Sequence, residues 1–178
     1  RATVARDERS GYLVAGKLMF MGRWLRWTAT YPVYQMRLMK RGEVRFVQVG
    51  HGQREGASQR GIGVLRQSYL HYALSKGLEE WRERHARYAE QEAQQAVRDI
   101  RAGAGDPAGL MAREPVRRRR ALKQLSYRLP FRSVLRFLYM YVLHLGFLDG
   151  WPGFAYCRLM ASYEGQVARR LKSLLRGV

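Results

Sequence analysis

The chain has 178 residues, of which 47% are apolar, and this is enough for one domain with its own hydrophobic core. Its net charge of +19 comes from 33 basic and 14 acidic residues, so we expect an anionic partner: a nucleic acid, anionic lipid headgroups or a diphosphate-bearing substrate. A single cysteine, Cys157, excludes an internal disulfide and a multi-cysteine metal site, and its apolar neighbours in sequence predict a buried, unreactive thiol.

Three strands are predicted in the first fifty residues, where apolar or alternating runs are bounded by glycine and proline. They are Leu13 to Phe20, Tyr31 to Met39, and Glu43 to Val49. The step from Lys40 to Glu43, which contains Gly42, predicts a compact turn that joins the last two strands as a hairpin. Five glycines between Gly50 and Gly63 predict a permissive loop, the natural place for a lid or a substrate loop.

A long helix is predicted from an N-cap at Ser75 toward Ile100, because apolar and aromatic residues recur there at helical spacing. The stretch from Ala102 to Pro107 is rich in glycine and alanine and predicts a flexible linker. The chain therefore divides into a sheet with its substrate loop, a long helix, a linker, and a basic, amphipathic helical region. These parts span residues 1–72, 73–101, 102–116 and 117–178.

The last third predicts helices that lie on a membrane surface. Four consecutive arginines, 117 to 120, begin a basic helix, and the uncharged run from Phe137 to Leu148 is shorter than the roughly 20 residues that a membrane-spanning helix needs. An apolar helix with arginine and tyrosine on its flanks suits the headgroup region instead. The Gly-Trp-Pro-Gly sequence at 150–153 predicts a turn into a final amphipathic helix over 154–175. Together these elements predict an α+β fold.

Polar side chains within the second strand are candidates for a binding site. Gln35 and Arg37 alternate with apolar neighbours, so both should lie on one face, where a cation would suit a phosphate group. The alternative for Arg37 is an edge-strand position over the core. Trp27 and Tyr31, with Trp24, could stack on sugar rings, and the alternative is that these aromatic residues belong to the core.

Several short motifs in a fixed order resemble a known family. They are Tyr-Gln-Met-Arg-Leu at 34–38, Leu-His-Tyr at 70–72 followed by Lys76 and by His-Ala-Arg-Tyr at 85–88, and Gly-Phe-Leu-Asp-Gly at 146–150. In this order they resemble the C-terminal, acceptor-side half of bacterial family 2 glycosyltransferases of the GT-A type, related to lipopolysaccharide inner-core transferases. The resemblance implies a small sheet from the end of a GT-A α/β domain, followed by a mostly helical C-terminal half.

The resemblance also implies roles for individual residues. Glu55 is the candidate base and His51 its partner, although Gly-Gln-Arg separates them here, where the family pattern has His and Glu adjacent. The alternative for Glu55 is a surface ion pair with Arg54 or Arg60. Four more residues would lie beside the nucleotide-sugar donor and its leaving diphosphate, and their alternatives are a structural histidine and a solvated helix surface. They are His71, Lys76, Arg87 and Tyr88.

The expected activity is sugar transfer, with inversion, from a nucleotide-sugar donor to a cell-envelope glycan or glycolipid. We expect it on the inner, cytoplasmic face of the cytoplasmic membrane, to which the protein would bind peripherally. A divalent metal, Mg²⁺ or Mn²⁺, is expected in the complete enzyme. The four aspartates contain no Asp-x-Asp pair, so we predict no metal ligands here and expect the nucleotide-binding and metal-binding half to precede Arg1 or to be a separate chain.

Two alternatives involve no catalysis. The charge, with aromatic residues among the arginines, also suits a basic nucleic-acid-binding protein. The sequence has no RRM, KH or zinc-finger pattern, so nucleic acid is the less favoured partner. The other alternative is a protein that binds the membrane surface through its helices alone.

Overall fold

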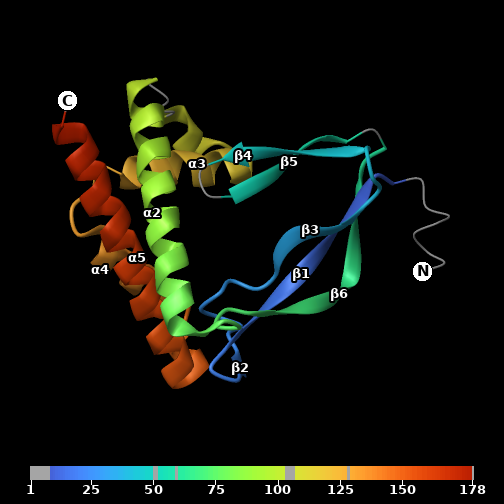
Figure 1. The fold of residues 1–178 in the computed structure, drawn as a ribbon, viewed down its shortest axis with the longest axis horizontal. Helices are drawn as coiled ribbons and strands as arrows, with labels where there is room; N and C mark the ends of the chain where they lie inside the picture. The colour runs from blue at the N-terminus through green and yellow to red at the C-terminus, as the bar shows by residue number, and fades with distance from the viewer. Residues whose placement is uncertain (1–8, 50–51, 59, 103–106, 128, 178) are drawn as a thin grey trace.

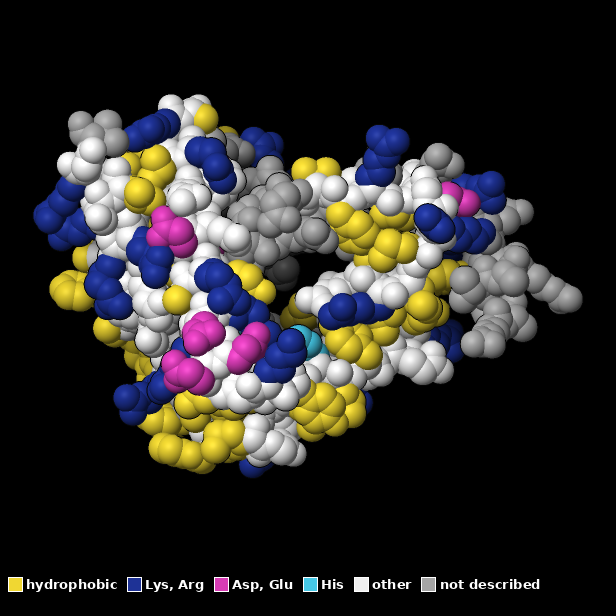
Figure 2. All heavy atoms as spheres, viewed as in Figure 1, with side chains coloured by type: hydrophobic (Ala, Val, Ile, Leu, Met, Phe, Trp, Pro, Cys, Tyr) yellow, Lys and Arg dark blue, Asp and Glu magenta, His cyan; other side chains and the backbone are white. Residues whose placement is uncertain are grey.

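A computed structural model describes residues 9–49, 52–58, 60–102, 107–127 and 129–177. The first part of the chain forms strands and the rest forms helices, which confirms the predicted α+β fold class. The strands and the helices make two layers, which meet at the lower end of the view in Figure 1, while at its upper end a two-stranded ribbon, residues 44–49 and 52–58, extends from the sheet toward the helices. Figure 2 shows that the molecule is hollowed between the two layers.

The sheet is built around β1 (Gly11–Phe20). β1 pairs antiparallel with β2 (Arg23–Trp24) and β3 (Val33–Met39), and parallel with β6 (Ile62–Tyr72). The two residues between β1 and β2, Met21 and Gly22, both have positive φ, as the tightest hairpin turns require. The parallel pairing brings β6 to β1 from a distant part of the sequence, so β1 has neighbours on both sides.

The predicted compact turn over 40–43 is confirmed, since the Glu43 N–H donates to the Lys40 carbonyl oxygen at 3.3 Å and Gly42 has positive φ, but the predicted hairpin pairing of the strands on either side is wrong. β4 (Val44–Val49) does not pair with β3 but forms a separate antiparallel ribbon with β5 (Gly52–Ser58). The predicted loop over 50–63 is also largely wrong, because most of it lies in β5 and in the start of β6. Gly56 lies where the backbones of the two strands come close together, since a Cβ at this position would lie only 3.0 Å from the carbonyl oxygen of Arg45.

The long helix is confirmed as α2 (Gly77–Arg101). It begins two residues after the predicted cap at Ser75, since Gly77 has positive φ and Lys76 is at the N-cap position. The Leu-His-Tyr motif at 70–72, which precedes α2, forms the end of strand β6. Glu79 and Glu80 in the first turn interact favourably with the helix dipole.

Six further elements follow α2. They are η1 (Pro107–Met111), α3 (Pro115–Ser126), α4 (Arg132–Leu138), η2 (Tyr139–Leu143), η3 (Gly146–Asp149) and α5 (Gly150–Arg176). The predicted linker therefore contains the short helix η1, and the predicted turn at 150–153 is instead the first turn of α5. The apolar run over 137–148 is not one helix, because Leu145 adopts the left-handed conformation (φ 55°) and ends it.

The core lies between α2 and α5, which run side by side in the same direction (Figure 1). Small residues on α2 let the two helices approach closely, and larger residues of α5 fill the space. Ala89 packs with Tyr163 and Val167, and one turn further Ala93 and its neighbours pack with Leu171.

A second cluster joins the two layers. Phe20 at the end of β1 and Leu25 are buried against the first turns of α5, where Tyr156 and Leu159 lie. The rings of Phe20 and Tyr156 meet edge to face with centroids 5.4 Å apart. This contact fixes the angle between sheet and helices, and with it the walls of the cavity described next.

Candidate functional site

A cavity of about 270 Å³ lies where the sheet meets the helical layer. Its sheet wall uses one face of three strands, because side chains two apart on a strand share a face. That wall consists of Gly16 and Leu18 of β1, Val33 and Gln35 of β3, and Tyr69 and His71 of β6. A cavity of this size holds one small ligand, since pockets for larger organic ligands run to about 300–1,000 Å³.

Tyr69 lies across β1 and connects the two outer strands. Its hydroxyl donates to Gln35 Oε1 at 2.6 Å and accepts from Arg37 Nη2 at 2.8 Å, while Arg37 also donates to Gln35 Oε1 at 2.6 Å. The Arg37 guanidinium lies 4.5 Å from the centre of the Tyr69 ring. The crossing requires Gly16, where a Cβ would lie 2.9 Å from the tyrosine oxygen. The prediction that Gln35 and Arg37 share a face is confirmed.

His71 is the only histidine among the described residues that line the cavity. Burial lowers the pKa of its imidazole, and the nearby charges of Arg37 and Arg84 lower it further. His71 is therefore neutral at pH 7, so one ring nitrogen donates a hydrogen bond and the other accepts one.

The opposite wall comes from the helices. Met140 of η2 and Met160 and Tyr156 of α5 supply an apolar surface, and Arg136 in the last turn of α4 supplies a charge. Burial raises the pKa of the Tyr156 hydroxyl, an effect that Arg136 opposes. The Nε atom of Arg136 is buried and has no hydrogen-bond partner within the described parts of the chain.

A buried carboxylate holds the two walls together. Asp149, at the end of η3, accepts hydrogen bonds from the backbone N–H groups of Arg26, Trp27 and Thr28 and from the Thr28 hydroxyl, over 2.7–3.2 Å. Thr28 in turn lines the cavity. Gly146 allows this close approach, since a Cβ there would lie 2.6 Å from the carbonyl oxygen of Met140. The Gly-Phe-Leu-Asp-Gly segment, which carries part of the family resemblance, thus forms one structural unit with residues 26–28.

The predicted aromatic residues flank the cavity but do not line it. Tyr31 packs edge to face against Trp24 with ring centroids 5.1 Å apart, as a core aromatic does. Trp27 is 40% exposed, with the Arg26 guanidinium 5.4 Å from its ring centre. Trp27 therefore keeps an open surface next to the cavity, whereas one face of Tyr31 is already occupied.

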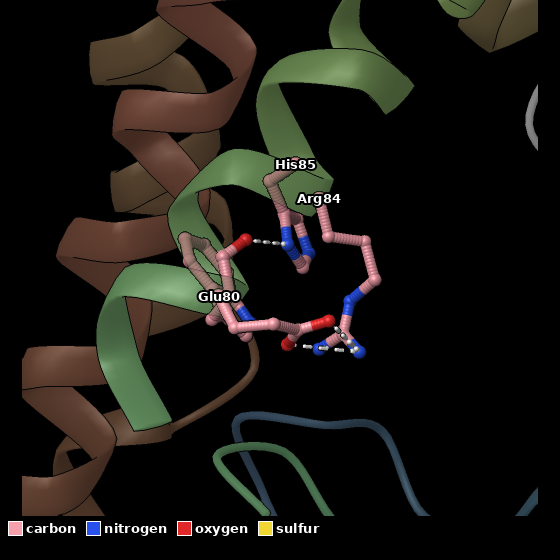
Figure 3. Close-up of polar contacts among 4 residues, drawn as sticks. Glu80, Arg84 and His85 are labelled. Atoms are coloured by element: carbon pink, nitrogen blue, oxygen red, sulfur yellow. Dashed lines mark hydrogen bonds and ion pairs between the residues drawn. The ribbon is translucent and has the colours of Figure 1, made fainter. Parts of the chain in front are cut away.

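The predicted cationic helix segment lies on α2, beside the cavity. Figure 3 shows its arrangement: Arg84 pairs with Glu80 at 3.3 Å, and His85 Nδ1 donates to the Trp81 carbonyl oxygen at 2.8 Å. His85 also stacks on the Trp81 ring at 3.6 Å and is thus a structural residue.

The remaining helix candidates do not reach the cavity. Lys76 and Arg87 are exposed, and Tyr88 packs partly against the core cluster around Ala89. None of these three belongs to the described residues that line the cavity. Of the predicted substrate-binding residues, the structure therefore brings together Gln35, Arg37 and His71.

The predicted catalytic pair lies on the β4–β5 ribbon. The backbone of Glu55 is in β5, opposite Phe46 of β4, so this residue belongs to a strand and not to the predicted loop. His51 lies outside the described residues.

The described residues do not fit a divalent metal. No group of three or more histidine, cysteine, aspartate or glutamate side chains that could hold one occurs in the part of the chain that the structure describes. The cavity wall carries an arginine and neutral polar groups, which repel or only weakly bind Mg²⁺. Burial also raises the pKa of the Cys157 thiol to about 11, so this cysteine stays protonated and confirms the predicted buried, unreactive thiol.

Sequence reasoning missed two residues of this site, Arg136 and Asp149. Arg136 was visible only as one member of a series of arginines spaced by four, and nothing local distinguishes it from Arg132. Asp149 stood within a recognised motif, but its partners are more than 120 residues away. Both residues act through long-range contacts, which periodicity does not report.

Comparisons with protein-family models, with curated proteins and with solved structures found no match for this chain.

Proposed function

We propose that this chain is the acceptor-side part of a family 2 glycosyltransferase of the GT-A type, related to lipopolysaccharide inner-core transferases. It helps transfer a sugar, with inversion, from a nucleotide-sugar donor to a cell-envelope glycan or glycolipid. The cavity between sheet and helices is the site for the acceptor.

One observation carries the proposal. The motif segments that resemble this family lie far apart in the sequence, yet they converge on one cavity: Gln35 and His71 line it, and Asp149 secures its wall. Neutral hydrogen-bonding groups beside aromatic and apolar surfaces are what a sugar ring needs, because each ring offers hydroxyls at its edge and C–H groups on its face.

Each residue has a proposed role. Gln35, Arg37 and His71 bind acceptor hydroxyls or charged substituents, and Trp27 with Tyr31 borders the sugar. Lys76, Arg87 and Tyr88 lie on the side of the donor diphosphate. Glu55, with His51, is the base that removes the proton from the attacking acceptor hydroxyl. The divalent metal of the complete enzyme would stabilise the leaving diphosphate and would be held mostly by residues outside this chain.

The test is a transfer assay on the natural polypeptide that contains this chain. Release of nucleoside diphosphate is measured with a panel of nucleotide sugars and an envelope lipid extract as acceptor. The variant Gln35→Ala with Arg37→Ala should lose at least tenfold in kcat/KM for the acceptor, while Arg101→Ala, at the far end of α2, should not change it. Absence of acceptor-dependent release with every donor would overturn the proposal.

The proposed location is peripheral, on the cytoplasmic face of the cytoplasmic membrane. No helix within the described residues has an apolar stretch long enough to cross a bilayer. Exposed apolar side chains instead gather from the start of α4 to the start of α5, and Figure 2 shows hydrophobic side chains along the lower edge of the helical layer. The most exposed of them are Phe131 (78%), Leu143 (73%) and Trp151 (66%).

An apolar surface in so basic a chain suits an anionic bilayer, because apolar side chains insert at the headgroup boundary while cations attract the lipid charge. The triple variant Phe131→Ser, Leu143→Ser, Trp151→Ser should bind phosphatidylglycerol vesicles at least tenfold more weakly. Replacing Arg117 and Arg118, which are exposed on α3, with glutamine should weaken binding mainly at low salt. Unchanged binding of the triple variant, or equal binding to neutral vesicles and to RNA, would contradict the membrane role.

A further inference from the structure

The starting observation is a contrast between two arginines one turn apart on α4. Arg132 is buried and forms an ion pair with Glu164 of α5 at 2.7 Å, although its Nη1 atom has no hydrogen-bond partner among the described residues. Arg136 lines the cavity, and its buried Nε atom has no hydrogen-bond partner among the residues that the structure describes. What distinguishes Arg136 from Arg132 is that its guanidinium lies at a cavity wall and forms no ion pair with a described carboxylate, so it can take an anion that enters the cavity.

No carboxylate balances Arg136 within the cavity. The described lining residues include no aspartate or glutamate. Asp149, which bonds the lining residue Thr28, is already bound by three backbone N–H groups and the Thr28 hydroxyl. Arg37 stands at the edge of the same cavity, and its only side-chain contacts among the described residues are with the neutral Gln35 and Tyr69. Among the described lining residues, the charge of the cavity is therefore positive and comes from Arg136 of the helix wall.

We infer that the cavity binds an anionic sugar. Arg136 holds the phosphate or carboxylate of that sugar, and the sugar ring lies against Tyr156, Met140 and Met160. This inference rests on the proposed function and narrows its acceptor to sugars with an oxyanion substituent. A guanidinium presents two parallel N–H donors that match the oxygens of a phosphate or a carboxylate, which a neutral sugar does not offer.

The arrangement of the opposite wall agrees with this assignment. Tyr69 and Gln35 bind each other and Arg37, and His71 is neutral beside them, so the sheet side offers hydroxyl-type partners. The anion would lie at the helix side and the sugar hydroxyls at the sheet side. The ligand would thus be oriented by charge at one end and by neutral hydrogen bonds at the other.

The test measures binding of four probes to the full chain by titration calorimetry: glucose 6-phosphate, glucuronate, neutral glucose and glycerol 3-phosphate. We expect one or both anionic sugars to bind at least tenfold more tightly than glucose. Arg136→Gln should remove that preference, so that glucose and the anionic sugars bind about equally, and Arg136→Lys should restore it partly. Arg101→Gln, which removes the same charge from an exposed position on α2, should have no effect.

Every outcome of this binding experiment either supports or overturns the inference. Equal binding of glucose and both anionic sugars, or an anion preference that survives in Arg136→Gln, would overturn the inference. Glycerol 3-phosphate binding as tightly as glucose 6-phosphate would also overturn it, since the site would then take a lipid headgroup. Thermal unfolding of every variant shows whether that variant is folded. If Arg136→Gln does not fold, Arg136→Lys is used in its place to test the anion preference. If the anionic sugars bind in a manner that depends on Arg136 but the transfer assay shows no sugar transfer, the proposed function is wrong and the present inference is not. If the protein transfers sugar to a neutral acceptor and the rate does not change in Arg136→Gln, the present inference is wrong and the proposed function is not.

Discussion

The helical layer and the cavity walls use charge in opposite ways. Between the helices, Arg132 pairs with Glu164 and Arg170 with Glu90, so each charge joins two elements and fixes their packing. At the cavity, Arg37 contacts neutral groups, and Arg136 forms no ion pair with a carboxylate of the described residues. We propose from this difference that positive charge in the helical layer serves stability, while positive charge at the cavity serves binding.

The largest expected effect tests the carboxylate that joins the two regions. Asp149→Ala leaves three backbone N–H groups and the Thr28 hydroxyl without their acceptor, and should lower the free energy of unfolding by about 4 kcal/mol. Urea denaturation followed by circular dichroism measures the change. The matched control is Asp99→Ala on α2, which loses one contact with Gln95 and should cost under about 1 kcal/mol. Similar costs for both variants would contradict the role of Asp149.

A pair of arginine variants then tests the contrast itself. Arg132→Ala leaves Glu164 without its partner at a buried position and should cost about 3 kcal/mol of unfolding free energy. Arg136→Ala removes a charge that no described carboxylate neutralises, so it should cost less than about 1 kcal/mol. Equal decreases in the free energy of unfolding, measured by urea denaturation, would show that both arginines stabilise the fold. The proposed difference between the helical layer and the cavity would then be wrong.

A smaller effect is expected at the sheet wall. Gly16→Ala forces Tyr69 to move away from β1 and should cost about 1 kcal/mol by overpacking. In a Tyr69→Ala background the same glycine change should cost less, because the ring that it meets is gone. A double-mutant cycle by urea denaturation measures this coupling. Additive effects would mean that Gly16 does not make room for Tyr69.

The smallest expected effect is a dependence of stability on pH. The folded pKa of His71 lies below the ordinary value of 6.5, so below pH 6.5 the unfolded chain binds a proton that the folded chain does not. Stability should therefore fall as pH drops from about 6.5 toward the lowered pKa of the folded state. His71→Gln should reduce this fall between pH 7 and pH 5 in urea denaturation. An identical pH profile for the variant would contradict the assignment.

The sequence correctly predicted the elements that depend on residues close together in the chain. Strands β1, β3 and β4 and helix α2 follow from apolar alternation and helical spacing, and the shared face of Gln35 and Arg37 follows from strand geometry. Strand β5 was missed because its glycines suggest a loop, although pairing with β4 gives them a regular partner.

The features that were missed depend on distant contacts. Strand β6 pairs in parallel with β1, which lies some fifty residues earlier, and no local signal reports such a pairing. The break at Leu145 in the apolar run occurs where Gly146 packs on the Met140 backbone and Asp149 reaches Thr28. The cavity, with Arg136 on one wall and His71 on the other, is a product of these tertiary contacts.

The hydrogen bond from Thr28 to Asp149 has a consequence for how the protein folds. It closes a loop of 121 residues, and the entropy lost in closing a loop rises with loop length. Contacts of such long range form slowly and late. During synthesis the sheet can assemble as soon as β6 leaves the ribosome, but the cavity has no second wall until Asp149 emerges. A premature stop codon shortly before Asp149 would therefore remove the carboxylate that joins the walls and also α5, against which α2 and the end of β1 are buried.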